Sequence, residues 1–170
     1  GWKLYVQGIG EPAGKEVPGL GDDPYFGDFS PNGQWLLFGK ENWIWKVPVN
    51  GGEVTKVYGV NNFKVMETND TFLVSRGVNG LSRVTADGSL KREDIAPVDK
   101  TAGAANYGRP ALLPNGKGAL DAVGYGTGVS KRHIGVVSLP GGKLTIIPEE
   151  GATNPRYSES GHILYTVDNV

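Results

Sequence analysis

The fold is decided by a short stretch, FSPNGQWLLF (Phe29–Phe38), in which a Ser-Pro-Asn-Gly turn separates an aromatic residue from a run of apolar residues. The same cassette returns as LLPNGKGALDAV (Leu112–Val123) and as YSESGHILYTV (Tyr157–Val167). A weaker copy reads ETNDTFLV (Glu67–Val74), and there we expect Asn69-Asp70 to supply the turn chemistry. A turn followed by a burst of apolar residues therefore recurs along the chain.

The cassettes recur at a regular spacing. Their turn glycines, Gly33, Gly116 and Gly161, lie 83 and 45 residues apart, so a unit of about 42 residues fits once the weaker copy is counted. A period of that length with several strands per unit is typical of β-propeller blades. The sequence therefore predicts an all-β fold of the β-propeller class.

A second pattern lies between the cassettes. Short runs of β-branched, aromatic and leucine residues occupy positions 2–6, 43–47, 81–84 and 134–137. Glycine turns follow these runs, and three contain Asn50-Gly51, Asp87-Gly88 and Gly141-Gly142, dipeptides that accept the positive φ of tight hairpins. Helical periodicity is nearly missing, and TAGAANYG (Thr101–Gly108) is too short and glycine-rich for more than one helical turn. Each unit is thus predicted to be a four-stranded antiparallel meander of strands a, b, c and d.

The meanders divide the chain into three whole blades and one blade that is split between its two ends. We expect whole blades over residues 20–59, 60–97 and 98–149, a half-blade of strands c and d over 1–19, and a half-blade of strands a and b over 150–170. The halves could join within one chain, as a closed four-bladed monomer, or between two copies, as an eight-bladed homodimer. We favour the homodimer slightly, because wedge-shaped blades suit a larger ring.

Composition excludes several classes of partner and site. The 17 basic and 18 acidic residues give a net charge of −1, so we expect no nucleic-acid partner. The chain has no cysteine, which excludes disulfides and thiolate metal sites, and it has no apolar run of about 18 residues that would span a membrane. Because the first residues lack the zones of a signal peptide, we expect a soluble chain, with any targeting segment on a longer precursor.

The cassettes resemble the WD-like repeat of TolB-type β-propellers, in which a Ser-Pro-Asp-Gly turn precedes an apolar strand and a later strand ends in a glycine pair. The matching stretches are FSPNGQWLLF, WIWKVPVNGGEV, LSRVTADGSLK and NPRYSESGHILYTV. Their order is especially similar to the propeller region downstream of the kinase domain in some bacterial serine/threonine protein kinases. The resemblance covers essentially the whole chain and implies a bacterial, periplasmic or extracytoplasmic protein.

The sequence departs from the family pattern in two respects. Asn32 and Asn115 stand where the family usually has aspartate, Glu159-Ser160 replaces the usual pair in the last copy, and the second copy lacks its proline. Asparagine keeps the turn propensity, so these changes affect the fold little. The larger departure is length, because such propellers usually have six or more blades and this chain supplies four blade equivalents.

Candidate binding residues gather where strand a begins in successive units. They are Asp23, Tyr25, Arg109, Arg156 and Tyr157. In a propeller, these positions approach the mouth of the central channel, where arginines offer forked donors for carboxylates and tyrosines offer flat contact area. The competing interpretation is that the charges solvate a rim and pair with one another. If a protein or a small ligand binds, we expect it to contact these residues.

Catalytic patterns are poor. The two histidines, His133 and His162, lie on different units beside apolar residues, and no Gly-x-Ser-x-Gly elbow occurs. GIGEPAG (Gly8–Gly14) reads as a hairpin turn, and GYGTG (Gly124–Gly128) reads as a flexible loop, with phosphate binding as a distant second interpretation. We therefore expect no catalytic residue, metal or cofactor. The leading hypothesis is a non-enzymatic interaction or scaffold module; the alternatives are a hydrolase or lyase with its site at the channel mouth, or an inactive fragment of a larger propeller.

The tryptophans and one sequon have plain structural interpretations. Trp2, Trp35, Trp43 and Trp45 could form a sugar-stacking platform, but we expect them to pack between blades, with Trp43 and Trp45 on one face. The sequon Asn69-Asp70-Thr71 is expected to be a turn first, and a glycosylation site only after secretion by a eukaryotic pathway.

Overall fold

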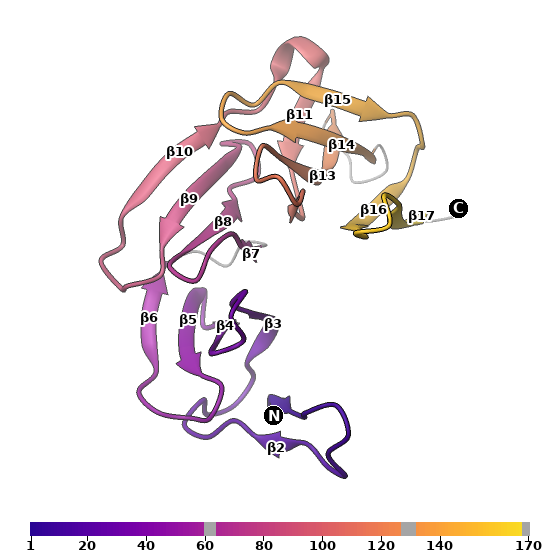
Figure 1. The fold of residues 1–170 in the computed structure, drawn as a ribbon. Coiled ribbons are helices and arrows are strands. Elements are labelled where there is room, and N and C mark those ends of the chain that lie inside the picture. Colours follow the sequence, from indigo (N-terminus) through magenta and orange to yellow (C-terminus); the bar gives the residue numbers. More distant parts are fainter. Residues whose placement is uncertain (60–63, 127–131, 168–170) are drawn as a thin grey trace. The chain divides into compact units, whose positions relative to one another are not determined.

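A computed structural model describes residues 1–59, 64–126 and 132–167 and shows an all-β chain (Figure 1). The expected all-β class is thus confirmed. The described residues form two compact units: the first holds residues 1–59, 66–72 and 84–91, and the second holds the remainder.

The main sheet of the first unit is a meander. Strands β3 (Tyr25–Phe29), β4 (Trp35–Lys40), β5 (Trp43–Pro48) and β6 (Thr55–Tyr58) pair in the order β3-β4-β5-β6, and all three pairings are antiparallel. The sequence pattern predicted this arrangement for residues 20–59. Alternation places Leu36, Phe38 and Val47 in the buried core of the unit.

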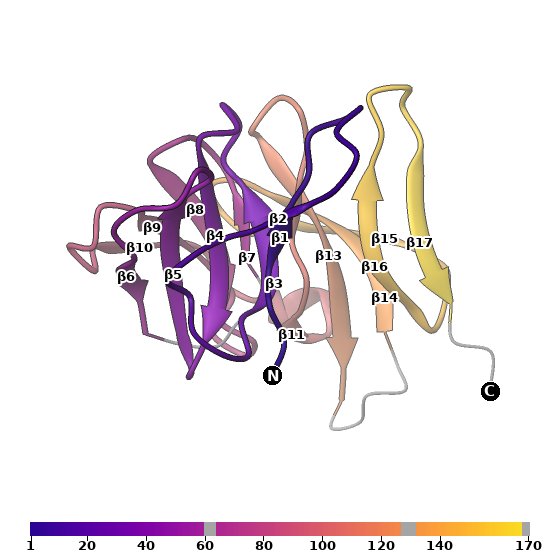
Figure 2. The ribbon, with the colours of Figure 1, turned by 90° about the horizontal axis from the view of Figure 1, so that it is seen from below.

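A short ribbon packs against this sheet. Strands β1 (Tyr5–Val6) and β2 (Lys15–Glu16) pair antiparallel, so the regular part of the first strand is shorter than the run 2–6 suggested. Leu4 and Val6 pack against the core that contains Leu36 and Phe38, and Figure 2 shows β1 beside β3. The loop Gly8–Gly14 joins the two strands as the expected hairpin turn, closed by the Glu11 N–H donating to the Gly8 carbonyl at 3.0 Å.

The second unit contains a five-stranded sheet. Its strands are β11 (Ala104–Tyr107), β12 (Ala111–Leu112), β13 (Gly118–Tyr125), β14 (Arg132–Ser138) and β15 (Leu144–Ile147). They pair antiparallel in the order β11-β13-β14-β15, and β12 pairs with the same edge of β13 as β11 does. Strands β11 and β12 together therefore stand where the pattern predicted a single strand a.

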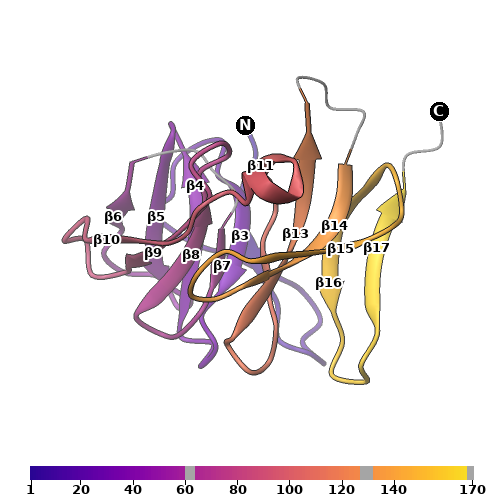
Figure 3. The same cartoon turned by 90° about the horizontal axis from the view of Figure 1, so that it is seen from above.

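A hairpin follows this sheet in the second unit. Strands β16 (Ala152–Tyr157) and β17 (Ile163–Val167) pair antiparallel, and β16 packs beside β13 and β14 (Figure 3). The shared core contains Leu120, Ile134 and Ala152, against which Tyr157 packs. Ile163 and Tyr165 of β17, from the apolar run after the last cassette turn, pack against the same core.

The remaining sheet has the order β10-β9-β8-β7. Its strands are β7 (Lys64–Met66), β8 (Thr71–Ser75), β9 (Leu81–Thr85) and β10 (Arg92–Ala96). Within the second unit, Leu73, Leu81 and Ile95 from this sheet are buried with Tyr107 and Val123. The alanine-rich stretch after it forms only the 3-10 turn η1 (Lys100–Ala102), as its length and glycine content predicted.

The cassette turns use the chemistry read from the sequence. Gly33, Gly116 and Gly161 have φ values of 70°, 65° and 84°, in the left-handed region that glycine adopts without steric cost. In the first and third cassettes, the amide oxygens of Asn32 and Asn115 accept hydrogen bonds from the backbone N–H two residues later. Asparagine therefore does serve as the turn acceptor.

The turn of the weaker cassette uses a different hydrogen-bond acceptor from the one expected. Thr68 Oγ1, rather than a side chain of Asn69-Asp70, accepts hydrogen bonds from the N–H groups of Asp70 and Thr71, at 3.1 and 3.0 Å. The Asn69 amide oxygen instead accepts from the Asn32 N–H at 3.0 Å. Threonine forms such turns in the same way as asparagine, so a turn lies where the pattern placed it.

Three of the sheets have an irregular first strand. The register shifts between Tyr25 and Asp28 in β3 and between Thr153 and Arg156 in β16. In the second unit's large sheet, residues 108–110 leave the edge of β13 between β11 and β12. Irregularities of this kind redirect side chains and free a few backbone groups from the ladder.

Asp121 compensates for the break between β11 and β12. It lies five residues after its turn glycine, a place that Phe38 occupies in the first cassette, and its side chain is 0% exposed. Its Oδ1 accepts a hydrogen bond of 2.5 Å from the Gly108 N–H. Burial raises the pKa of Asp121 to about 8, although the hydrogen bond from Gly108 and the charge of Arg132 act in the opposite direction.

This burial predicts an unusual pH dependence of stability. Because the folded pKa lies above the ordinary value of about 3.9, the free energy of unfolding should fall as pH rises from about 4 through about 8. Asp121→Asn keeps an oxygen for the Gly108 N–H and cannot ionise. We expect the melting temperature of this variant, relative to wild type, to rise by several degrees between pH 5 and pH 9, measured by circular dichroism.

Asp94→Asn is the matched control for this measurement. The pKa of Asp94 is lowered, chiefly by the Ser82 hydroxyl, so this carboxyl stays ionised throughout that pH range. The melting difference between Asp94→Asn and wild type should be constant from pH 5 to pH 9. A constant difference for Asp121→Asn as well would show that Asp121 does not take up a proton on folding.

Candidate functional site

The first unit has a pocket where β3 begins, beside the residues that precede β1. Its volume is about 650 Å³, and its walls are Trp2, Lys3, Leu4, Asp23, Pro24 and Tyr25. Two of the five residues singled out from the sequence, Asp23 and Tyr25, therefore lie together on this pocket. Trp2, Leu4 and Pro24 make much of the wall apolar, while Lys3 and Asp23 bring one charge of each sign.

Asp23 is fixed by hydrogen bonds to Trp2. Its Oδ1 accepts from the Trp2 N–H at 2.8 Å, and its own N–H donates to the Trp2 carbonyl at 3.0 Å. Its φ of 59° is left-handed, a conformation that aspartate tolerates better than most residues with a side chain. These contacts hold the Asp23 carboxylate at the pocket wall.

Tyr25 is positioned by a glycine in the neighbouring strand. Tyr25 pairs with Gly39 of β4, and a Cβ atom at position 39 would overlap the Tyr25 ring. The second unit repeats this arrangement, because Asn106 pairs with Gly124 and a Cβ there would lie 2.7 Å from the Asn106 amide oxygen. The glycine thus lets a first-strand side chain lie across the sheet.

The charge of Lys3 is compensated at the edge of the pocket. Its Nζ lies 2.9 Å from Glu16 Oε1 and 3.1 Å from Glu16 Oε2. The pKa of Lys3 is raised, mainly by this hydrogen bond to Glu16 and then by the charge of the same carboxylate. Asp23 and the adjacent, exposed Asp22 therefore give the pocket an acidic character.

The tryptophans divide into two groups. Lys46 Nζ lies 4.0 Å from the centre of the Trp35 ring, and Lys56 Nζ lies 4.8 and 4.9 Å from the centres of the Trp43 and Trp45 rings. Lys56 thus contacts the shared face expected for Trp43 and Trp45. Trp2 is different because 78% of it is exposed, and sequence reasoning missed its place on the pocket wall.

The other three candidate residues belong to the second unit. Arg109 lies in the break between β11 and β12, where its guanidinium donates to the Asn154 amide oxygen. Arg156 is exposed and donates to the Pro155 carbonyl at 2.9 Å, while Tyr157 is half-buried against the core beside β13 and β14. The structure brings Arg109 to strand β16, but it gives Tyr157 a packing role.

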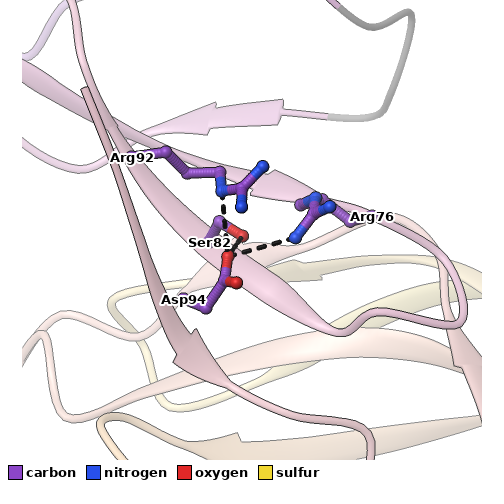
Figure 4. Close-up of polar contacts among 4 residues, drawn as sticks. All are labelled: Arg76, Ser82, Arg92 and Asp94. Atoms are coloured by element: carbon purple, nitrogen blue, oxygen red, sulfur yellow. Dashed lines mark hydrogen bonds and ion pairs between the residues drawn. The ribbon is translucent and has the colours of Figure 1, made fainter. Parts of the chain in front are cut away.

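A polar network on β9 and β10 was not anticipated from the sequence. Asp94 Oδ1 accepts from the Ser82 hydroxyl at 2.6 Å and lies 3.1 Å from nitrogen atoms of both Arg76 and Arg92 (Figure 4). The Asp94 side chain is 55% exposed, so solvent screens these ion pairs. We interpret the network as a stabilising surface feature of this sheet.

The described residues give little support for catalysis. Ser160 Oγ lies 3.0 Å from His162 Nδ1 in an exposed turn, and within the described ranges no carboxylate is hydrogen-bonded to this histidine to orient it. The His133 ring makes an edge contact with Tyr125, their centres 5.3 Å apart. In the part of the chain that the structure describes, no three His, Cys, Asp or Glu residues group as metal ligands. The loop GYGTG continues into residues 127–131, outside the described residues.

Over residues 1–59, 64–126 and 132–167, no helix has the length and apolar character needed to cross a bilayer.

The contact between Tyr25 and Gly39 gives a test of the pocket geometry. Gly39→Ala should push the Tyr25 ring from its place and lower the free energy of unfolding by about 1–3 kcal/mol, as overpacking does. In wild type, the ring should shift the Gly39 Hα resonance upfield, and this shift should vanish in the variant. Gly27→Ala is the control, because a Cβ there meets Leu4 at an ordinary 3.7 Å and should change stability by less than about 0.5 kcal/mol. An unchanged Tyr25 environment in Gly39→Ala would contradict the geometry.

Comparison with known proteins finds a solved structure with a similar fold. No protein-family model matches the chain, and no curated protein matches it. Among solved structures, the chain is similar to TolB from Acinetobacter baumannii, with a TM-score of 0.69 and 17% sequence identity. The match covers 98% of this chain and 43% of the TolB chain, so this chain spans less than half the length of that protein. The similarity supports a TolB-like β-propeller fold, the fold class to which the cassettes pointed.

Proposed function

We propose that this chain is a non-enzymatic interaction module that binds a protein segment or a small ligand where the first strands of its sheets begin. The observation that carries the proposal is the pocket in the first unit, where an exposed indole, a tyrosine ring and a fixed carboxylate converge. Such combinations of aromatic area with a single charge are common at binding sites.

The irregular first strands support the same proposal. Asp23 and Tyr25 precede the shift in β3, Arg109 lies in the break between β11 and β12, and Arg156 follows the shift in β16. Bulges and breaks of this kind are over-represented beside functional sites because they redirect side chains out of the ladder. We propose these residues as the contact points.

A hydrolase or lyase remains the competing hypothesis, and the structure favours it less. The most strongly perturbed carboxyl, Asp121, is completely buried, so it does not offer its oxygens to a substrate. The exposed pair Ser160 and His162 has only local turn contacts. A binding role needs neither group.

The resemblance to propeller regions of bacterial serine/threonine kinases suggests the wider setting. We propose that the chain is the sensor or scaffold part of a larger bacterial protein, placed in the periplasm or another extracytoplasmic compartment. The match to 43% of the TolB chain is compatible with this proposal, since a longer parent protein could carry further blades.

A peptide titration tests the binding proposal. We expect at least one of three blocked pentapeptides, one acidic, one basic and one neutral aromatic, to shift the backbone amide resonances of residues 2–4 and 23–25, or of 108–109 and 156–157. The shifts should saturate, and mass spectrometry should recover the peptide unchanged. If none of the peptides shifts these resonances at millimolar concentration, or if the peptide is cleaved, the proposal is wrong.

We also propose a homodimer formed through the two incomplete sheets. In the described part of the chain, β17 pairs only with β16 and β1 only with β2, whereas β4 and β13 are paired on both edges. Tyr5 and Leu164 on these strands are 61% and 73% exposed, which favours a covering strand. Sedimentation equilibrium should give twice the chain mass at high concentration. The mass of one chain at every concentration would rule the homodimer out.

A further inference from the structure

The charged groups on and beside the pocket wall indicate which kind of ligand the pocket suits. The Asp23 carboxylate accepts one hydrogen bond on Oδ1, from the Trp2 N–H. Among the described residues, neither Asp22 nor Asp23 forms an ion pair. Lys3 is the cation on the wall, and Glu16 compensates it at 2.9 Å. Lys3 and Glu16 thus compensate each other, whereas the charges of Asp22 and Asp23 have no ion pair in the described part of the chain, and charge complementarity favours a cationic occupant.

The aromatic part of the wall points in the same direction. Trp35, Trp43 and Trp45 each lie next to a lysine amine, at 4.0 to 4.9 Å from the ring centre. Within the described residues, Trp2 has no such cation, although it is the most exposed of the four. An exposed indole beside a carboxylate can take a cation from outside, because the ring face and the carboxylate attract the same charge.

The geometry of the carboxylate is prepared before binding. Asp23 has a left-handed φ of 59° and exchanges two hydrogen bonds with the backbone of Trp2, so its carboxylate is held beside the segment 1–4, whose indole lines the same pocket. A ligand that contacts this carboxylate therefore loses little free energy to ordering it.

We propose that this pocket binds the guanidinium group of an arginine side chain in a partner protein segment, held between the Trp2 ring and the Asp23 carboxylate. The inference rests on the proposed function and names the ligand class for its first-unit site. A guanidinium suits the site better than an ammonium because it is planar, stacks on an indole and donates paired hydrogen bonds to a carboxylate. Tyr25, Leu4 and Pro24 would contact the apolar stem of the arginine.

The test uses the whole chain and two blocked peptides, acetyl-Gly-Gly-Arg-Gly-Gly-amide and the same peptide with citrulline, which is neutral and nearly the same shape. We expect the arginine peptide to shift the backbone amides of Lys3, Leu4, Asp23 and Tyr25 in a saturable way. The citrulline peptide should bind at least ~10-fold more weakly, and the affinity of the arginine peptide should fall as salt is added.

Three variants separate the contributions. Asp23→Asn should weaken binding of the arginine peptide ~10-fold or more, because it removes the charge yet keeps an acceptor for the Trp2 N–H and tolerates the left-handed φ. Trp2→Ala should weaken binding by ~2–5-fold. Glu53→Gln is the matched control, since it removes one negative charge from an exposed position of the same unit outside the pocket wall. The affinity of this variant for the arginine peptide should equal that of wild type.

The outcomes distinguish this inference from the function on which it rests. Equal affinities for the arginine and citrulline peptides, or no loss in Asp23→Asn, would overturn the guanidinium site. Binding of only the acidic or the aromatic peptide of the titration would also overturn it and would leave the interaction module in place. If no peptide of either series bound, the proposed function would fail together with this inference.

Discussion

The structure depends on one constraint: the first strand of a sheet leaves the register of its neighbour while its buried backbone groups still need hydrogen-bond partners. The chain meets this constraint with side chains. Asp121 accepts from the buried Gly108 N–H in the break between β11 and β12, and in an exposed position Thr166 donates to the Thr153 carbonyl beside the shift in β16. Polar residues at these places in apolar strands are therefore structural partners of an irregular backbone.

The same irregularity contributes to the position of one candidate residue, Arg109. Where the strand leaves the ladder, its side chains no longer alternate between core and solvent, and they can turn towards a pocket or a neighbouring strand. Arg109, in the break between β11 and β12, reaches Asn154 in this way. The pocket of the first unit depends on other contacts, because Asp23 lies before β3 and is held at the wall by hydrogen bonds to the Trp2 backbone. The glycine opposite Tyr25 leaves room for the ring across the sheet.

Much of the local structure could be predicted from the residues. Turn glycines with left-handed φ, the hairpin over Gly8–Gly14 and the single helical turn near Thr101 follow from short-range chemistry, which a sequence displays directly. The candidate site could be predicted only in part. Their position before strand a points to Asp23 and Tyr25, whereas the pattern predicts only a strand residue at Trp2, because the place of Trp2 on the pocket wall depends on Asp23, 21 residues away.

The sequence by itself determined the all-β class, the cassettes and the meander order, because turn propensities and alternation act between residues that are close along the chain. Tertiary structure alone decided that Asp121 is buried and has a raised pKa, that Tyr157 packs into a core while Arg156 is exposed, and that the Trp2 backbone contacts Asp23. These outcomes depend on which segments lie together after folding, and burial and partner choice are properties of that packing rather than of the residue types.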